Sequence, residues 1–497
     1  MKRLIFNEKY INIFSLILIF YMLFVRVLLI FSYSIDLDGL EFCFLPHIQN
    51  VIDEKPLYPN PMVFPYHACT FVPLYFYVVA IPIAQFNLSI STDLHLIYII
   101  GRLFSLFFFI FLIFILLFYV RYRFKISMQK ILVITTLYLL LMTGHVYALR
   151  PDALKLLFFS ISFLLLVEYT FFNNRLIYLI SFLFFSVLTV FTKQDSIIYL
   201  SVLIFSIFIS SRNYMYLWLL LLLYFLIIIL FSLMYFVYGS YFFENVILLN
   251  LQMNDSITTS INILFIFTSL ARILPIVLLI YYFKSYKLLL NSLEKFSLIL
   301  FSLLFVFGHI LMLRTGSYLN YAFESIFVLI FFMLIYNLNI NQVKQHNLKF
   351  FSVFFYLILL FSTNKIIHNY SYSYKKEIEL KCTYFDNFKI GKDLKKIIKN
   401  DYAFCVDNKS AVFLYGINLV HGYDFNIGRM MEAYLSIKGN SKLIFFNSEN
   451  YENEFKNGHV KYLIIGSDKE YLVKKDFPEF CLLKRAESMS LFMYCKK

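Results

Sequence analysis

The stretch "INIFSLILIFYMLFVRVLLIFSYSIDLDGLEFCFLPH", residues 11–47, decides the fold class. Its first part, Ile11–Phe31, is apolar and long enough to cross a bilayer, because a spanning helix needs about 20 such residues. Lys2 and Arg3 precede this segment, and no small-residue cleavage pattern follows it. We therefore expect an uncleaved first helix whose N-terminus lies in the cytoplasm.

Similar apolar segments recur as far as residue 363, in a chain that is 61% hydrophobic and only 15% charged. The composition then changes, because residues 365–497 hold 38 of the 74 Lys, Arg, Asp and Glu residues. Short apolar runs such as "YAFCVD", "KLIFF" and "KYLIIG" alternate there with helical patterns such as "GKDLKKIIKN" and "IGRMMEAYLSIK". The sequence predicts a polytopic all-α membrane domain, residues 1–364, followed by a small extracytoplasmic α/β domain, residues 365–497.

The distribution of basic residues predicts the topology, because Lys and Arg are retained in cytoplasmic loops. Most of the net charge of +14 follows from this topology, so no nucleic-acid partner is expected. The cytoplasmic markers are Arg121, Arg123, Lys125, Lys130, Arg175, Arg212, Lys284, Lys287, Lys295, Lys344 and Lys349. Between them we place eleven spanning helices, at about 11–31, 97–120, 131–149, 151–172, 176–192, 196–211, 214–238, 262–283, 296–313, 322–339 and 350–364.

The apolar segment "FVPLYFYVVAIPIAQF", residues 71–86, is not counted as a crossing. A crossing here would place the Arg121–Lys125 cluster outside and invert the charge pattern. Pro73 and Pro82 also disfavour a straight span. We expect an interfacial or re-entrant helix that closes a large outer loop, residues 32–96.

The first motif with chemical potential is the acidic group that follows the first helix, Asp36, Asp38 and Glu41. A carboxylate there can remove a proton from an acceptor hydroxyl as general base, and paired carboxylates can hold a divalent cation. The alternative is a solvated cap on the next helix.

The second motif is "LRPDALK", residues 149–155. Pro151 suits the first turn of a helix, whose free N–H groups can bind a phosphate together with Arg150 and Lys155. The alternative is that Asp152 caps its own helix and pairs with Lys155 one turn later.

The third motif, "FTKQDS", residues 191–196, is a polar break between two predicted helices. Lys193 is costly in such an apolar hairpin unless it is paired or reaches the interface. Ordinary turn chemistry with a pair between Lys193 and Asp195 is the alternative.

The fourth motif, "LRTGSYLNYAFE", residues 313–324, offers Arg314, Asn320, Tyr321 and Glu324 around a glycine turn. All four motifs map to the outer side, as a shared extracytoplasmic cavity requires. The six cysteines map there too, which permits disulfides in an oxidising compartment, although their spacing gives no connectivity and leaves free thiols equally open.

The order of these motifs resembles that of the bacterial GT-C glycosyltransferases, which are related to protein mannosyltransferases and aminoarabinose transferases. "DLDG", then "DEKPLYPNP" and "FVPLYFY" are similar to the first outer loop of that family. "RPDAL", "TKQD" and "GSYLNYAFE" resemble further stretches of one bacterial branch. The resemblance covers most of residues 30–330.

This resemblance implies transfer of a hexose or pentose from a polyprenyl-phosphate donor to an acceptor hydroxyl at the outer face of the bacterial cytoplasmic membrane. The acceptor is a glycolipid, a glycan or a protein. Metal dependence varies in the family, so a divalent cation on Asp36 and Asp38 stays open, and no nucleotide cofactor is expected.

The resemblance also assigns residues to roles. The catalytic carboxylate corresponds to Asp38, with Asp36 as second candidate. Relatives often have adjacent Asp and Glu, whereas Gly39 follows Asp38 here, which makes Glu41 a third candidate. Arg150, Lys193 and Arg314 would hold the donor phosphate. The supporting residues would be Asp152, Gln194, Asp195, Asn320, Tyr321 and Glu324.

Two other functions share the outer charge cluster. A flippase or secondary transporter for lipid-linked sugars would need ionisable residues near the membrane midplane and often has an internal repeat. Only Arg26 and Arg272 lie deep in predicted helices, and the two halves of the chain show no repeat. A glycan polymerase or ligase is the other alternative.

Overall fold

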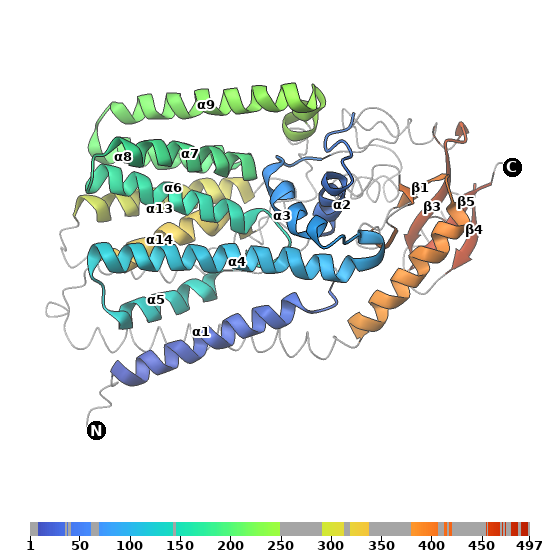
Figure 1. Cartoon of the computed structure of the whole chain (residues 1–497), viewed down its shortest axis with the longest axis horizontal. Helices are drawn as coiled ribbons and strands as arrows, with labels where there is room; N and C mark the ends of the chain where they lie inside the picture. The colour runs from blue at the N-terminus through green and yellow to red at the C-terminus, as the bar shows by residue number, and fades with distance from the viewer. Residues whose placement is uncertain are drawn as a thin grey trace.

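The computed structural model describes residues 8–34, 37, 41–60, 69–142, 146–248, 291–312, 319–336, 379–405, 412–414, 417–419, 454, 456–467, 470, 473, 479–485 and 489–495. Long helices run side by side through most of the molecule, and a small sheet with one helix lies at one end of them (Figure 1). The helical bundle and the sheet with its helix, here called the C-terminal domain, therefore lie in different parts of the described structure (Figure 1).

The helices of the bundle follow the predicted order. They are α1 (Glu8–Ile30), α4 (Ile90–Phe124), α5 (Met128–Leu141), α6 (Asp152–Phe171), α7 (Leu176–Thr192), α8 (Ser196–Ser211), α9 (Met215–Tyr238), α13 (Ser292–Met312) and α14 (Phe323–Ile335). Three short elements also lie among the described residues: α10 (Tyr241–Phe243) and η2 (Glu244–Leu248) follow α9, and η3 (Leu319–Ala322) precedes α14. Among the described residues, α1, α4, α6, α9 and α13 are long and apolar enough to cross a membrane. The predicted helices 262–283 and 350–364 lie outside the described residues.

Two helix boundaries differ from the prediction by seven and eight residues, more than the others do. Helix α4 begins at Ile90 because the hydroxyl of Ser89 accepts a hydrogen bond from the N–H of Ser91 and caps it. Helix α5 ends at Leu141, well before residue 149. Its end is stabilised by Arg26, which donates hydrogen bonds to the carbonyl oxygens of Leu139 and Met142. A cation at this position complements the negative end of the helix dipole.

The first outer loop contains two short helices, α2 (Glu41–Ile52) and α3 (Leu74–Gln85). Each has 12 residues and is therefore about 18 Å long, well short of the roughly 30 Å hydrocarbon core. Helix α3 starts after Pro73 and contains Pro82. The expected short helix within residues 71–86 is thus present, and it lies beside α2 (Figure 1).

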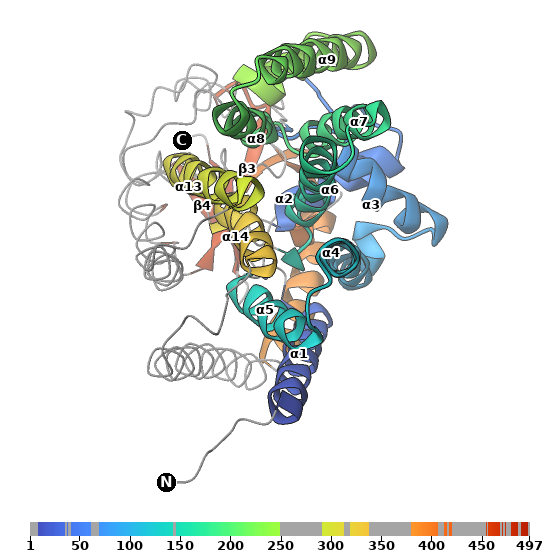
Figure 2. The same ribbon diagram turned by 90° about the vertical axis from the view of Figure 1, so that its left-hand side faces the viewer.

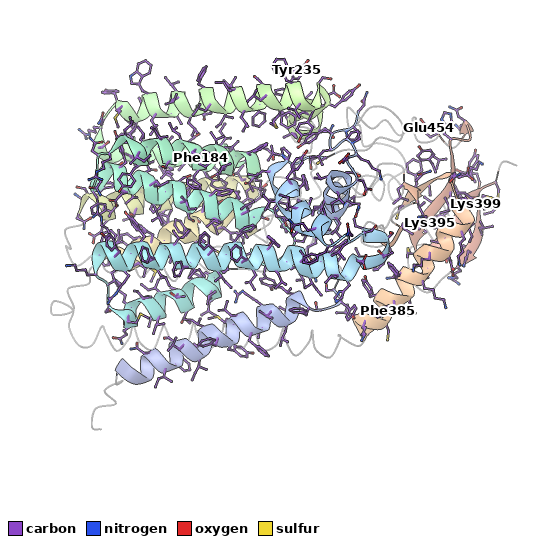
Figure 3. All side chains as sticks on the ribbon, in the orientation of Figure 1. Phe184, Tyr235, Phe385, Lys395, Lys399 and Glu454 are labelled. Carbon is purple, nitrogen blue, oxygen red and sulfur yellow. A yellow bond between two sulfur atoms is a disulfide. The ribbon has the colours of Figure 1, made fainter. Side chains whose placement is uncertain are left out.

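The bundle has a buried interior and an apolar outer surface. Helix α6 is largely buried, whereas α9 lies at the edge of the bundle and is largely exposed (Figure 2). Phe184 on α7 and Tyr235 on α9 are 59% and 44% exposed and project from the bundle (Figure 3). Apolar side chains on such a surface are suited to contact lipid tails. The described helices therefore form an integral membrane domain.

The C-terminal domain pairs a helix, residues 379–398, with a five-stranded sheet. The strands are β1 (Tyr402–Cys405), β2 (Asn418–Leu419), β3 (Val460–Gly466), β4 (Phe480–Arg485) and β5 (Met489–Tyr494), in the order β2-β1-β3-β5-β4. Strands β1, β2 and β3 are parallel, whereas β5 is antiparallel to β3 and β4. The predicted strands "YAFCVD" and "KYLIIG" and the helix "GKDLKKIIKN" are confirmed. The segments "KLIFF" and 427–438 lie outside the described residues.

Aromatic side chains join this domain to the bundle. Tyr33, just after α1, stacks on His95 of α4 with ring centroids 4.0 Å apart. The rings of Tyr384 and Phe385, on the C-terminal helix, lie 5.4 and 5.7 Å from that of Tyr33. Phe385 marks the end of that helix nearest to the bundle in Figure 3. The C-terminal domain is therefore docked on the segment that leads into the acidic motif.

Candidate functional site

A buried carboxylate, Asp152, connects three of the predicted motifs. Its Oδ2 accepts a hydrogen bond from Nε of Arg150 at 3.0 Å. Its Oδ1 accepts bonds from Nζ of Lys193 at 3.0 Å and from Nδ2 of Asn320 at 2.7 Å. Asp152 is inaccessible to solvent, and its three partners are at least 94% buried. Both predicted phosphate ligands in the described chain therefore share one carboxylate.

Local structure explains why these residues meet. Pro151 precedes the first residue of α6, which places Asp152 in the first turn of that helix. Lys193 directly follows the last residue of α7, in the turn that leads to α8, and Asn320 lies in η3, just before α14. All three connections are at the end of the bundle that carries α2, α3 and the C-terminal domain (Figure 1). The side chains therefore converge although they are far apart in sequence.

Lys193 has a second acidic neighbour and an aromatic one. Its Nζ lies 3.5 Å from Oδ2 of Asp195 and 4.8 Å from the centre of the Tyr321 ring. Burial lowers the pKa of the Lys193 ammonium, but Asp152 and Asp195 together outweigh this effect and raise that pKa above its ordinary value. Lys193 therefore remains a cation at neutral pH.

A second ion pair lies next to this group, between Lys155 and Glu324. Nζ of Lys155 is 2.7 Å from Oε1 of Glu324, and neither side chain is more than 1% exposed. Lys155 also lies 4.9 Å from the ring centre of Tyr199, whose hydroxyl donates a hydrogen bond to the carbonyl oxygen of Tyr321. Helix α6 is thus joined to α8, η3 and α14 through polar contacts in the bundle interior.

These six ionisable side chains have balanced charge. The cations are Arg150, Lys155 and Lys193, and the anions are Asp152, Asp195 and Glu324. Several buried acceptor atoms at this site have no hydrogen-bond donor in the described part of the chain, including both oxygens of Asp195, although Oδ2 lies 3.5 Å from Nζ of Lys193, and Oε1 of the neighbouring Gln194. Such acceptors can bind hydroxyl groups of a ligand, since an unpaired buried acceptor is costly.

Gln194 connects the site to the first outer loop. Its Nε2 donates a hydrogen bond of 2.8 Å to the carbonyl oxygen of Thr70. Thr70 lies four residues before the first residue of α3, so the turn between α7 and α8 is tied to the first outer loop.

Glu41, the third carboxylate proposed as catalytic, is engaged in a different contact. Both of its oxygens accept hydrogen bonds from Arg102, at 2.9 Å from Nε and 2.6 Å from Nη2. Both side chains are fully buried. Arg102 lies on an apolar helix, and nothing in its sequence surroundings indicates the partner, because the pair spans 61 positions.

The alternative in which Asp152 pairs with Lys155 one turn later is not observed, because Lys155 contacts Glu324 instead.

The remaining predicted site residues, Asp36, Asp38 and Arg314, lie outside the described residues. No group of three or more His, Cys, Asp and Glu side chains within the described residues is arranged to hold a metal ion. A cation site on Asp36 and Asp38 therefore stays a prediction.

Neither a protein-family model nor a curated protein sequence matches this chain. The solved structures that are similar over almost the whole length include crystal structures of ArnT from Cupriavidus metallidurans bound to undecaprenyl phosphate and in the apo state. Each of these two comparisons gives a TM-score of 0.59 and 10% sequence identity, and the aligned region covers 97% of this chain and 98% of the ArnT chain. The chain has the ArnT fold. The predicted resemblance to aminoarabinose transferases, a GT-C group, is thereby confirmed at the level of the fold.

Proposed function

We propose that the protein is a glycosyltransferase that moves a sugar from a polyprenyl-phosphate donor to an acceptor hydroxyl. The observation that carries the proposal is the pair of buried cations, Arg150 and Lys193, in a membrane-embedded ArnT fold. One of the similar ArnT structures is bound to undecaprenyl phosphate, a lipid phosphate of this class. Cations buried at a bundle end are suited to hold a phosphate whose lipid tail lies along the helices.

The proposed roles follow from charge and hydrogen bonding. Arg150 and Lys193, together with Arg314, stabilise the charge that develops on the leaving phosphate. Asp195 and Gln194 accept hydrogen bonds from sugar hydroxyls. Asp38, with Asp36 as second candidate, removes the proton of the acceptor hydroxyl as general base.

The proposed site of action is the outer face of the cytoplasmic membrane. Two observations support this orientation. The Cys481–Cys495 disulfide in the C-terminal sheet suits an oxidising compartment. The basic segment Arg121–Lys125 lies at the opposite end of the bundle, where α4 ends and α5 begins (Figure 1), as expected for a cytoplasmic loop.

The test is transfer by the purified protein in nanodiscs from a panel of polyprenyl-phosphate hexoses and pentoses. We expect the Asp36→Asn/Asp38→Asn variant to lose transfer at normal membrane levels. The control is Asp53→Asn in the same loop, since Asp53 forms a partly exposed pair with Lys55 and should be dispensable. Full activity of the double variant would exclude both acids as bases.

Mass spectrometry of envelope glycolipids and glycoproteins from a deletion strain identifies the sugar and the acceptor. One species that lacks a hexose or a pentose supports transfer. An unchanged glycan profile with altered lipid-linked sugar transport would favour a flippase instead. Loss of long glycan chains with intact repeat units would favour a polymerase.

A further inference from the structure

Arg102 binds the chain just before the acidic motif at several points. Its Nη2 donates a hydrogen bond to the carbonyl oxygen of Ser34 at 2.6 Å, and its Nη1 lies 3.4 Å from those of Ile30 and Ser32. The guanidinium also lies over the ring of Tyr98, 4.7 Å from its centre. One side chain of α4 therefore fixes the backbone from the end of α1 to the residue two positions before Asp36.

Glu41 binds the chain on the other side of that motif. In addition to Arg102, its Oε2 accepts a hydrogen bond from the backbone N–H of Leu37 at 2.7 Å. Its Oε1 accepts one from the backbone N–H of Leu149 at 2.6 Å. Each carboxylate oxygen thus receives one guanidinium and one backbone donor, and Leu149 is the neighbour of Arg150. A carboxylate with this environment is poorly placed to remove a proton from a substrate.

The contact between Leu149 and α4 is independently close. A Cβ atom added to Gly101 would lie 1.9 Å from Cδ1 of Leu149, and Leu149 is fully buried. The absence of a side chain at the position before Arg102 therefore lets the 149 segment approach α4. This approach brings the N–H of Leu149 to Glu41.

We propose that Arg102 and Glu41 form a clasp that positions the first-loop acids relative to Arg150, and that neither residue touches the substrate. The proposal rests on the proposed function for its catalytic part only. The clasp holds the residues that flank Asp36 and Asp38, whereas Arg150 is held by Asp152. Loss of the clasp should therefore impair the chemical step more than donor binding, because a small misplacement of a catalytic group can reduce the rate about 100-fold.

The test uses three variants and two measurements. Glu41→Gln/Arg102→Met removes both charges together, which avoids the uncompensated buried charge left by either single change. Arg102→Lys keeps the positive charge but loses the bidentate geometry. The control is Glu168→Gln/Arg123→Met, which removes a partly buried ion pair at the opposite end of the bundle.

The first measurement is hydrogen exchange of peptides that cover residues 31–42 and 146–150, which needs no turnover. Both clasp variants should exchange faster than wild type in these peptides and normally in the rest of α4, whereas the control should be unchanged there. Wild-type exchange in the double clasp variant would overturn the clasp.

The second measurement is sugar transfer, with kcat and donor KM determined separately. Both clasp variants should lose kcat by about 100-fold with little change in donor KM, and the control should match wild type. A normal kcat in the double variant would overturn the positioning role. If wild type transfers no sugar from any polyprenyl-phosphate donor, the proposed function fails, and hydrogen exchange still decides whether the clasp orders the loop.

Discussion

Replacement of Asp152 by Asn is the most informative single change in the site. Asn keeps the size of the side chain and one oxygen that can accept the bond from Asn320 or Lys193. It removes the negative charge that Arg150 and Lys193 share at 3.0 Å each. Lys193 retains Asp195 at 3.5 Å. The variant therefore leaves one unit of uncompensated positive charge in a buried site.

The size of the effect follows from burial. Removal of one partner from a buried ion pair typically costs about 3–5 kcal/mol, because the other charge is left without compensation. Asp152 is fully buried, and Arg150 and Lys193 are nearly so. Asp152→Asn without a bound ligand should therefore lose roughly this amount of unfolding free energy. An anion that enters between the two cations should restore part of it. At a ligand concentration 100 times its Kd, the gain is about 2.7 kcal/mol.

The assay is thermal unfolding in detergent, followed by size-exclusion chromatography after heating, with and without undecaprenyl phosphate. Asp152→Asn should unfold at a lower temperature than wild type and gain more from the lipid phosphate. The matched control is Asp195→Asn, which removes an 11% exposed carboxylate with a longer contact to Lys193 and should lose less. Equal losses in the two variants, or a lipid effect no larger in Asp152→Asn than in wild type, would refute the charge argument.

Two further predictions concern the ion pair of Lys155 with Glu324 and the C-terminal domain. Lys155→Met or Glu324→Gln alone should lower the unfolding free energy by about 3–5 kcal/mol, because each leaves a buried charge without its partner. Lys155→Met/Glu324→Leu should recover most of this loss, because both charges are removed together. Thermal unfolding of the three variants measures these differences, and a double variant as unstable as the sum of the two single variants would contradict the prediction. Burial raises the pKa of Tyr384 to about 12, so the folded domain favours the neutral phenol. The stabilisation that this neutral phenol gives the folded domain should be complete below about pH 10 and lost as the pH rises to about 12. Limited proteolysis of the C-terminal domain between pH 9 and 12 should show this loss in wild type, and Tyr384→Phe should shift it to higher pH; an unchanged profile in the variant would assign the alkaline transition to another group.

The helices of the bundle were largely predictable because each one is a long apolar segment between polar breaks. Most ends lie within a few residues of the predicted positions, since Pro151 and the polar turns at 193–195 and 212–214 are local signals. The end of α5 was not predictable, because it depends on Arg26, which is more than 100 positions away. Strands β4 and β5 were not predicted, although "FCLLKR" and "MSLFMY" each contain a run of four apolar residues, as "VKYLIIG" of β3 does.

Three of the predicted site residues meet in the structure, but most of their pairing was not predictable. Residue type and topology placed Arg150, Lys193 and Asn320 on one side, and the structure brings all three to Asp152. Sequence spacing favoured local pairs such as Asp152 with Lys155. The local pair of Lys193 with Asp195 is present at 3.5 Å, whereas Lys155 and Arg102 pair with the distant Glu324 and Glu41. Long-range ion pairs leave no periodic signal, so the structure was needed to find them.

Charge balance links the resting site to the proposed reaction. With three cations and three anions, the described site is neutral before a donor binds. A polyprenyl-phosphate sugar is a phosphodiester with one negative charge, and transfer of the sugar leaves a phosphate monoester with a charge of about −1.5 to −2 near neutral pH, since its second pKa is about 6. Arg150 and Lys193 should therefore bind the product more strongly than the donor, which favours the chemical step. Asp152 competes with that product for both cations, so it should also promote release of the lipid phosphate, and Asp152→Asn should retain it longer than wild type does.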